Sequence, residues 1–144
     1  MNTEPTALRR LLQPPCTIAV VGLSANPQRP SHGVAHYMQQ HGFRIVPVNP
    51  RYGAAGESIL GEPCYANLGD IPFAIDIVDV FRRSEDVLPV AVQAVQIGAK
   101  CLWQQIGVEN READELARAA GLVSVMNLCL KIEHARLLGA GQPG

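Results

Sequence analysis

The chain has 144 residues, of which 12 are cationic, 13 are acidic and 47% are hydrophobic. That length suits one domain with its own core, and the near-zero net charge argues against a nucleic-acid-binding surface. No apolar run approaches the roughly 18 residues of a membrane span, and the N-terminal segment lacks the pattern of a signal peptide. The four cysteines form no C-x-x-C pair, so free thiols are expected. We therefore expect a cytoplasmic protein that binds neither nucleic acid nor a membrane.

Short apolar runs alternate with longer amphipathic segments, a pattern typical of a parallel α/β sheet. Residues 17–23 predict a buried central strand, 31–42 a helix and 44–50 a second strand. Pro47 predicts a free edge at that second strand, because proline has no N–H to donate. A glycine-rich loop is expected over 53–61, followed by a short strand over 63–66.

The second half of the chain continues the same alternation. Ser84 and Asn110 are the expected helix N-caps. The predicted elements are strands over 74–81, 100–106 and 122–126, and helices over 84–97, 110–120 and 128–138. Residues 139–144 predict a flexible tail. We expect one domain over 1–144, with its core over 8–138, built as a three-layer, doubly wound, mostly parallel α/β sheet.

The segment after the first strand has the residue types of a phosphate-binding loop. Ligands of open parallel sheets bind at the carboxyl ends of the strands. Gly22 permits a tight turn there, Ser24 offers a hydroxyl, and Arg29 adds a guanidinium before a helix whose N-terminal amides favour anions. The alternative is that Gly22, Pro27 and Pro30 only shape a strand-to-helix turn.

This loop departs from the dinucleotide-binding pattern G-x-G-x-x-G. Ser24 and Pro27 stand where its second and third glycines are required. The second strand also ends without the acidic residue that usually binds the ribose of NAD. Asn49 stands there instead, and Arg51 suits a phosphorylated ribose. These features favour a phosphorylated adenine nucleotide other than NAD, and both NADP and coenzyme A qualify.

Aromatic and polar residues follow the third and fourth predicted strands. Phe81 is a candidate cover for an adenine or a pantetheine arm. Arg82 is either a diphosphate ligand or a solvated surface charge, and Trp103 is either a stacking platform or a core residue. Asp79, near the strand end, is expected to accept hydrogen bonds from backbone amides.

Titratable side chains elsewhere give weaker signals. His32 and His36 are spaced i, i+4 on the first predicted helix, but no third zinc ligand lies near them in the sequence. Lys131, Glu133 and His134 favour a surface charge cluster over an acid–base pair.

Five short motifs occur in a fixed order along nearly the whole chain. They are V-G-L-S-A-N-P-Q-R-P-S at 21–31, V-P-V-N-P at 46–50, D-V-F-R at 79–82, L-W-Q-Q-I-G at 102–107 and C-L-K-I-E-H at 129–134. Together they resemble the family of small CoA-binding domains, over about residues 8–138. The resemblance implies a Rossmann-like fold related to the CoA-binding domain of succinyl-CoA synthetase α chains.

The resemblance also implies where the ligand lies. The first loop would hold the CoA diphosphate, and the loops after later strands would hold the adenosine and pantetheine. The implied CoA-binding residues are Gly22, Ser24, Pro27, Arg29, Ser31, Asn49, Pro50, Val80, Phe81, Arg82, Trp103, Gln105 and Gly107. Asn127 and Leu128 depart from the Asp-Arg pair common in the family, which puts the role of that pair in doubt.

The implied function is the non-catalytic binding of CoA or an acyl-CoA. A small NADP-dependent or acyl-CoA-processing enzyme is the alternative, with His32 or a thiol as its acid–base group. A nucleotide-responsive sensor is a third hypothesis. The expected partner is a small nucleotide ligand, and the sequence leaves a protein partner or a homodimer open. No metal site and no catalytic residue is predicted.

Overall fold

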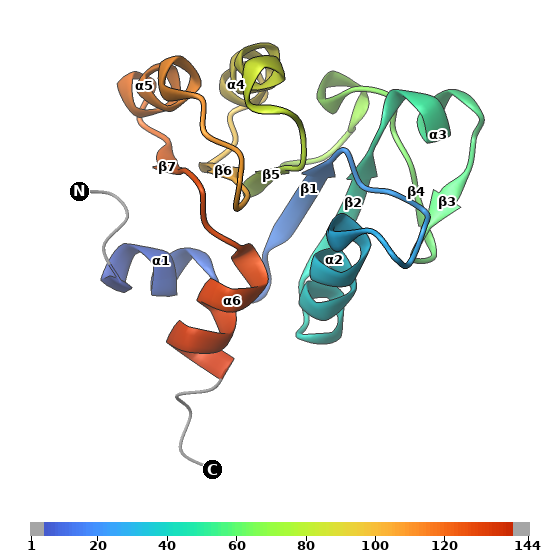
Figure 1. Ribbon diagram of the computed structural model, residues 1–144, viewed down its shortest axis with the longest axis horizontal. Helices are drawn as coiled ribbons and strands as arrows, with labels where there is room; N and C mark the ends of the chain where they lie inside the picture. Colours follow the sequence, from blue (N-terminus) through green and yellow to red (C-terminus); the bar gives the residue numbers. More distant parts are fainter. Residues whose placement is uncertain (1–4, 140–144) are drawn as a thin grey trace.

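A parallel sheet of five strands forms the centre of the computed structural model, which describes residues 5–139 (Figure 1). Of the tail expected over 139–144, residues 140–144 lie outside the described residues. The strand order is β2-β1-β5-β6-β7. Their bounds are Thr17–Val21 for β1, Arg44–Val48 for β2, Ile77–Val80 for β5, Cys101–Gln104 for β6 and Val123–Val125 for β7. The doubly wound parallel sheet predicted from the sequence is confirmed.

Helices cover both faces of this sheet, which gives three layers (Figure 1). Helices α1, α2 and α6 pack on one face, and α4 and α5 pack on the other. Their bounds are Pro5–Leu11 for α1, Pro30–Gln40 for α2, Val87–Gln96 for α4, Arg111–Ala119 for α5 and Leu130–His134 for α6. A π-helical segment, Ala135–Gly139, continues α6. No helix within residues 5–139 is long and apolar enough to cross a membrane.

The central strands are continuous apolar runs because both of their faces are buried. In β1, Ile18 and Val20 pack toward α1, α2 and α6, whereas Ala19 and Val21 pack toward α4 and α5. The edge position predicted from Pro47 is confirmed, since β2 is an outer strand of the sheet.

Several elements differ from their predicted form. The short helices α1 and α3, the latter Pro50–Ala54, were not expected. The predicted short strand at 63–66 is instead β4, Glu62–Pro63, which pairs with β3, Ser58–Ile59, inside the expected loop.

One predicted cap is confirmed and one is wrong. Asn110 accepts a hydrogen bond from the Ala113 amide at 2.9 Å and so caps α5. Ser84 begins a 3₁₀ turn, Ser84–Asp86, that precedes α4. Its hydroxyl accepts from the Glu109 amide at 2.9 Å, so Ser84 connects this turn to the loop after β6 instead of capping a helix.

The direction in which the strands are added reverses at β1. The chain passes from β1 through α2 to β2 on one side, and then crosses back to β5 on the other. Parallel strands bring their carboxyl ends to one edge, and the crevice at such a reversal is where ligands bind in open α/β sheets. The loops that follow β1, β2, β5 and β6 therefore meet at this edge.

Asp79 is fully buried in the middle of the sheet, and its predicted bonding to backbone amides is wrong. Neither carboxyl oxygen has a hydrogen-bond partner among the described residues. Asp79 pairs in register with Val20 on one side and Trp103 on the other, on the face covered by α1, α2 and α6. Burial raises the pKa of Asp79 well above its ordinary value, because an apolar surrounding disfavours the charged form.

We expect Asp79→Asn to remove a pH dependence of stability. In the wild type the folded pKa lies above the unfolded one. The stabilisation from the protonated acid is therefore complete below pH ~4 and is lost as pH rises through the folded pKa. Urea unfolding from pH 4 to 8 should show the free energy of unfolding falling more steeply in the wild type than in Asp79→Asn. Asp70 is exposed, so Asp70→Asn is the control. Identical slopes of the free energy of unfolding against pH in the wild type and in Asp79→Asn would contradict the raised pKa of Asp79.

Candidate functional site

Gly22, at the end of β1, brings the loops after three strands into contact. Its φ is +90°, and a Cβ at this position would lie 2.2 Å from the carbonyl oxygen of Phe81. Only glycine fits this approach. The Gly22 amide also donates to the Val48 carbonyl at 2.8 Å, and the Phe81 amide donates to the Val21 carbonyl at 2.8 Å. The ends of β1, β2 and β5 are thereby held together.

The loop between β1 and α2 is fixed by its own side chains. The hydroxyl of Ser24 accepts from the Asn26 amide at 3.0 Å, and the carboxamide oxygen of Asn26 accepts from the Gln28 amide at 2.9 Å. The hydroxyl of Ser31, in the first turn of α2, accepts from the Ser24 amide at 3.1 Å. A hydroxyl that accepts still has its own hydrogen to donate, so Ser24 and Ser31 retain donors.

The start of α2 suits an anion. Arg29 is its N-cap in an extended conformation without a side-chain cap, and Pro30 occupies the first turn. The first turn carries no acidic residue, so no carboxylate of the helix itself neutralises the positive end of the helix dipole. Arg29 is exposed and adds a full positive charge at this end.

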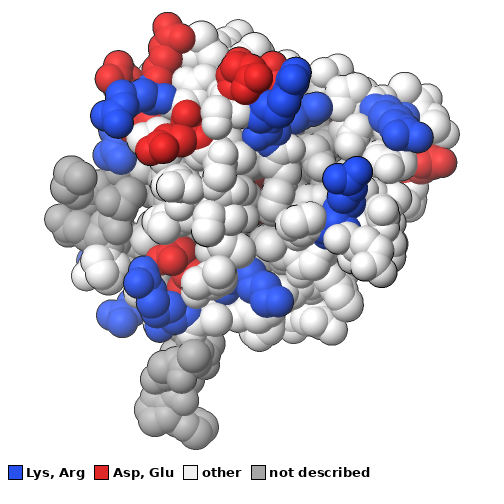
Figure 2. All heavy atoms as spheres, in the orientation of Figure 1, with Lys and Arg blue, Asp and Glu red and all other residues white. Residues whose placement is uncertain are grey.

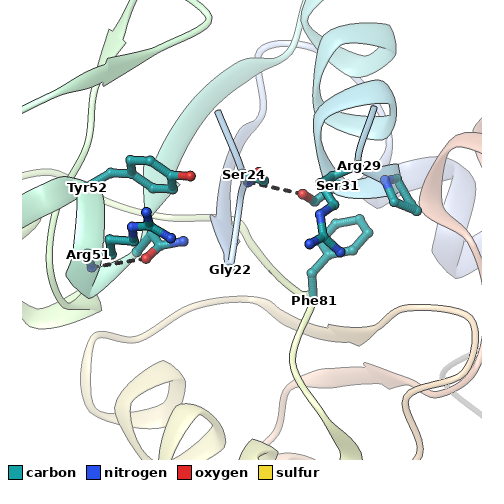
Figure 3. Close-up of a pocket in the computed structure, with 9 residues that line it drawn as sticks. Gly22, Ser24, Arg29, Ser31, Arg51, Tyr52 and Phe81 are labelled. Carbon is teal, nitrogen blue, oxygen red and sulfur yellow. Dashed lines mark hydrogen bonds between the residues drawn. The ribbon is translucent and has the colours of Figure 1, made fainter. Parts of the chain in front are cut away.

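A cavity of about 380 Å³ lies between this helix start and the end of β2, and we call it the arginine cleft. Figure 3 shows Arg51 and Tyr52 on one side of it and Arg29, Ser31 and Phe81 on the other. The full lining is Gly22, Ser24, Arg29, Pro30, Ser31, Asn49, Arg51, Tyr52 and Phe81. Two guanidinium groups and a helix N-terminus thus face one space, which suits a ligand with more than one phosphate.

Asn49 lines the arginine cleft, but its side chain also supports the surrounding structure. Its Oδ1 accepts from the Arg51 amide at 3.0 Å and caps α3, while its Nδ2 donates to the Leu23 carbonyl at 3.1 Å. Asn49 thereby joins the loops after β1 and β2. The predicted contact with a ribose or adenine would have to use the remaining acceptor capacity of Oδ1.

A second, larger cavity of about 640 Å³ adjoins the arginine cleft, and we call it the apolar cavity. The two share Pro30 and Phe81 in their linings. The full lining of the apolar cavity is Pro30, Val34, Phe81, Arg82, Arg83, Asp86, Gln105, Ile106, Val108 and Cys129. Arg82 also lines a third hollow of about 240 Å³, together with Pro50. Arg83 forms an exposed ion pair with Asp86 at 3.1 Å.

Five of the predicted site residues do not line the arginine cleft or the apolar cavity, and one of these, Pro50, lines only the third hollow. Pro27 is exposed on the loop before α2. The amide of exposed Gly107 donates to Asn127 Oδ1 at 2.7 Å. The side chain of Val80 is buried against α4 and α5, and Trp103 is fully buried on the opposite face.

Trp103 is a core residue, so its alternative role as a stacking platform is wrong. Its indole N–H donates to the Leu128 carbonyl at 2.8 Å, which satisfies the one polar group of the ring. Gln105 is also buried, although it lines the apolar cavity, and its Oε1 accepts from the Leu130 amide at 3.0 Å. Both side chains attach the start of α6 to β6.

The titratable residues of α2 and α6 form no acid–base or metal site at the cleft. No cluster of three metal-binding side chains occurs within residues 5–139. His134 is buried and not on the surface as expected, and its Nδ1 lies 2.9 Å from the hydroxyl of Tyr37. Burial lowers the pKa of His134, with a smaller contribution from His41. Glu133 is buried too and pairs with Arg136.

The cysteines are free thiols, as expected. Burial raises the pKa of Cys16 to about 12, and it also raises the pKa values of Cys64 and Cys101. These three thiols therefore stay protonated at neutral pH and are poor nucleophiles. Cys129 is half-buried and lines the apolar cavity.

Several residues that line the two cavities are not among the predicted site residues. Tyr52 was missed because Asn49 and Pro50 were assigned to a strand end, although an Asn followed by Pro is a typical helix start. Val34, Ile106 and Val108 carried no signal, since apolar residues at helix and loop positions are usually part of a core. Arg51 had been noted only as compatible with a phosphorylated ribose.

Comparison with known proteins identifies the family. The family model described as CoA binding domain matches residues 16–135. The uncharacterized protein YneT of Bacillus subtilis is 40% identical over 134 residues, which cover 93% of this chain and 96% of YneT. A solved structure from Thermus thermophilus, cell-free ID.343, has a TM-score of 0.89 and 34% identity, and the match covers 94% of this chain and 100% of that one.

A further relative is a much larger enzyme. Acetate--CoA ligase [ADP-forming] II of Archaeoglobus fulgidus is 32% identical over 88 residues, which cover 60% of this chain but 12% of the ligase. The similarity therefore concerns one part of that enzyme. The match to the family model and the match to YneT along nearly the whole of both chains agree with the expected resemblance: this chain belongs to the CoA binding domain family.

Proposed function

We propose that this protein binds coenzyme A or an acyl-CoA at the carboxyl edge of its sheet and does not transform it. The arginine cleft is the observation that carries the proposal. There Arg29, Arg51 and the N-terminus of α2 face one space in a member of the CoA binding domain family. CoA carries a diphosphate and a separate ribose phosphate, so it offers two anionic groups to two guanidinium groups.

The positions of the lining residues suggest how CoA would bind. The diphosphate would lie at the start of α2, within reach of Arg29 and the hydroxyl of Ser24. Arg51, on the other side of the cleft, would bind the ribose 3′-phosphate. The pantetheine arm would then pass Phe81, which both cavities share, toward Gln105 in the apolar cavity.

The chemistry of the lining supports a binding role over catalysis. Among the described residues, the lining of the arginine cleft includes no His, Asp, Glu, Lys or Cys that would transfer a proton at neutral pH. In the apolar cavity, Asp86 is paired with Arg83. Cys129 also lines this cavity, but the nearby histidine of α6, His134, contacts the hydroxyl of Tyr37 and does not serve as its base. An acid–base pair for an NADP-dependent or acyl-processing enzyme is not assembled here.

We expect CoA to stabilise the protein more than NADP, NAD or ATP. A ligand that binds only the folded state adds about 2.7 kcal/mol to the free energy of unfolding at 100 times its Kd. A thermal-shift titration should show the melting temperature rising with CoA concentration. Stabilisation by NADP with none by CoA would overturn the proposal, and native mass spectrometry of the purified protein would reveal a co-purified ligand by its mass.

Arg29→Ala should weaken CoA binding without unfolding the protein, because the side chain is exposed. Loss of a charge-assisted hydrogen bond costs about 1.5–3 kcal/mol, or roughly 10- to 150-fold in Kd. Isothermal titration calorimetry measures the change. Exposed Arg111, which begins α5 away from both cavities, supplies the matched control Arg111→Ala. Equal affinities of Arg29→Ala and Arg111→Ala would remove Arg29 from the site.

Arg51→Ala tests the binding of the ribose phosphate separately. We expect the wild type to bind CoA more tightly than dephospho-CoA, which lacks the 3′-phosphate. This preference should shrink by roughly 10-fold or more in Arg51→Ala, because the lost contact is a charge-assisted hydrogen bond. The affinity for dephospho-CoA itself should change little. An unchanged preference in the variant would show that Arg51 does not contact this phosphate.

A further inference from the structure

The apolar cavity lies where the sheet reverses direction, between the start of α2 and the loops after β5 and β6. It is formed by Pro30 and Val34 from α2, by Phe81 after β5, and by Gln105, Ile106 and Val108 after β6. Cys129, next to the start of α6, completes the wall. At about 640 Å³ it falls within the usual size range of small-molecule sites, roughly 300–1,000 Å³.

Uncharged residues dominate this part of the surface. Six of its ten lining residues are apolar: Pro30, Val34, Phe81, Ile106, Val108 and Cys129. Figure 2 shows one face of the molecule with a broad area free of charged side chains across its middle and cationic and acidic side chains around that area. Ile106 is 65% exposed on the wall of this cavity, so an apolar ligand in the cavity would remove its side chain from water.

The connection to the arginine cleft defines which part of a ligand reaches this cavity. Phe81 and Pro30 belong to both linings, so a ligand bound by its phosphates continues directly past them. Beyond its diphosphate, CoA has only the pantetheine arm and the thiol at its end. A free thiol would leave the side chain of Ile106 in water, whereas an acyl group on that thiol would cover it.

We propose, on the basis of the CoA-binding function above, that the apolar cavity holds the acyl group of an acyl-CoA and that the ligand is a short aliphatic acyl-CoA in preference to free CoA. Four apolar side chains of the lining suit an uncharged aliphatic acyl group: Val34, Phe81, Ile106 and Val108. The acid at the cavity, Asp86, is paired with Arg83, so this ion pair offers no free charge to a carboxylate on the acyl group. Arg82 is the remaining cation of the lining. The opposing hypothesis is that Arg82 binds the free carboxylate of a dicarboxylic acyl group.

The test is a series of ligands measured on the wild-type protein. Isothermal titration calorimetry would compare CoA, acetyl-CoA, butyryl-CoA and hexanoyl-CoA. Each buried methylene should tighten binding about fourfold until the cavity is full, which amounts to about 15-fold between acetyl-CoA and butyryl-CoA. Succinyl-CoA has the same number of acyl carbons as butyryl-CoA but ends in a carboxylate, and we expect it to bind more weakly than butyryl-CoA.

A variant pair locates the effect in the cavity. Ile106→Ser should reduce the affinity ratio of butyryl-CoA to acetyl-CoA, because it removes apolar surface from the wall. Ile132, which is 56% exposed on α6 and does not line the cavity, supplies the matched control Ile132→Ser. That control should keep the wild-type ratio, and both substitutions affect exposed side chains outside the core.

The outcomes separate this inference from the function on which it rests. Equal affinities for CoA and all its esters would overturn the acyl assignment and leave CoA binding intact. Tighter binding of succinyl-CoA than of butyryl-CoA would also overturn it, in favour of recognition by Arg82. A protein that bound neither CoA nor any ester would contradict the proposed function itself.

Discussion

The close packing of Gly22 against the carbonyl of Phe81 determines how the rest of the carboxyl edge is arranged. A side chain at position 22 would push the ends of β1 and β5 apart, since a Cβ would lie 2.2 Å from the Phe81 oxygen. With glycine there, the loop that leads into α2 passes directly beside the loop after β5. Phe81 then stands between two cavities and contributes to both. The arginine cleft and the apolar cavity therefore depend on the same contact.

Much of the fold follows from local patterns in the sequence. Strands β1, β2, β5, β6 and β7 fall inside the predicted runs, because strands buried on both faces are continuously apolar. Helix α3 was missed since its apolar periodicity is too short to detect, although its cap and its first proline are visible in Asn49 and Pro50. The predicted start of the strand at residue 74 was early, as β5 begins at Ile77.

The site was predicted less completely, for a physical reason. Sequence places a residue at the end of a strand but does not tell whether its side chain turns toward ligand or core. Trp103 lies one residue before the end of β6, yet its side chain, like that of Asp79, packs beneath α1, α2 and α6 and not toward the cavities. Gln105 reaches the cavity, yet its oxygen is bonded to the Leu130 amide. Such partners come from segments distant in the sequence, so no local pattern reports them.

The sharing of Phe81 has a consequence for how a ligand gains affinity. A molecule that fills both cavities is two fragments joined by a linker, and the second fragment enters at a high effective concentration once the first is bound. Each fragment alone would bind weakly, while the joined molecule would bind far more tightly than either. Anything that moved the Phe81 ring would uncouple the fragments without removing a single contact to phosphate. The affinity for such a molecule would therefore depend on the junction as much as on the two ends.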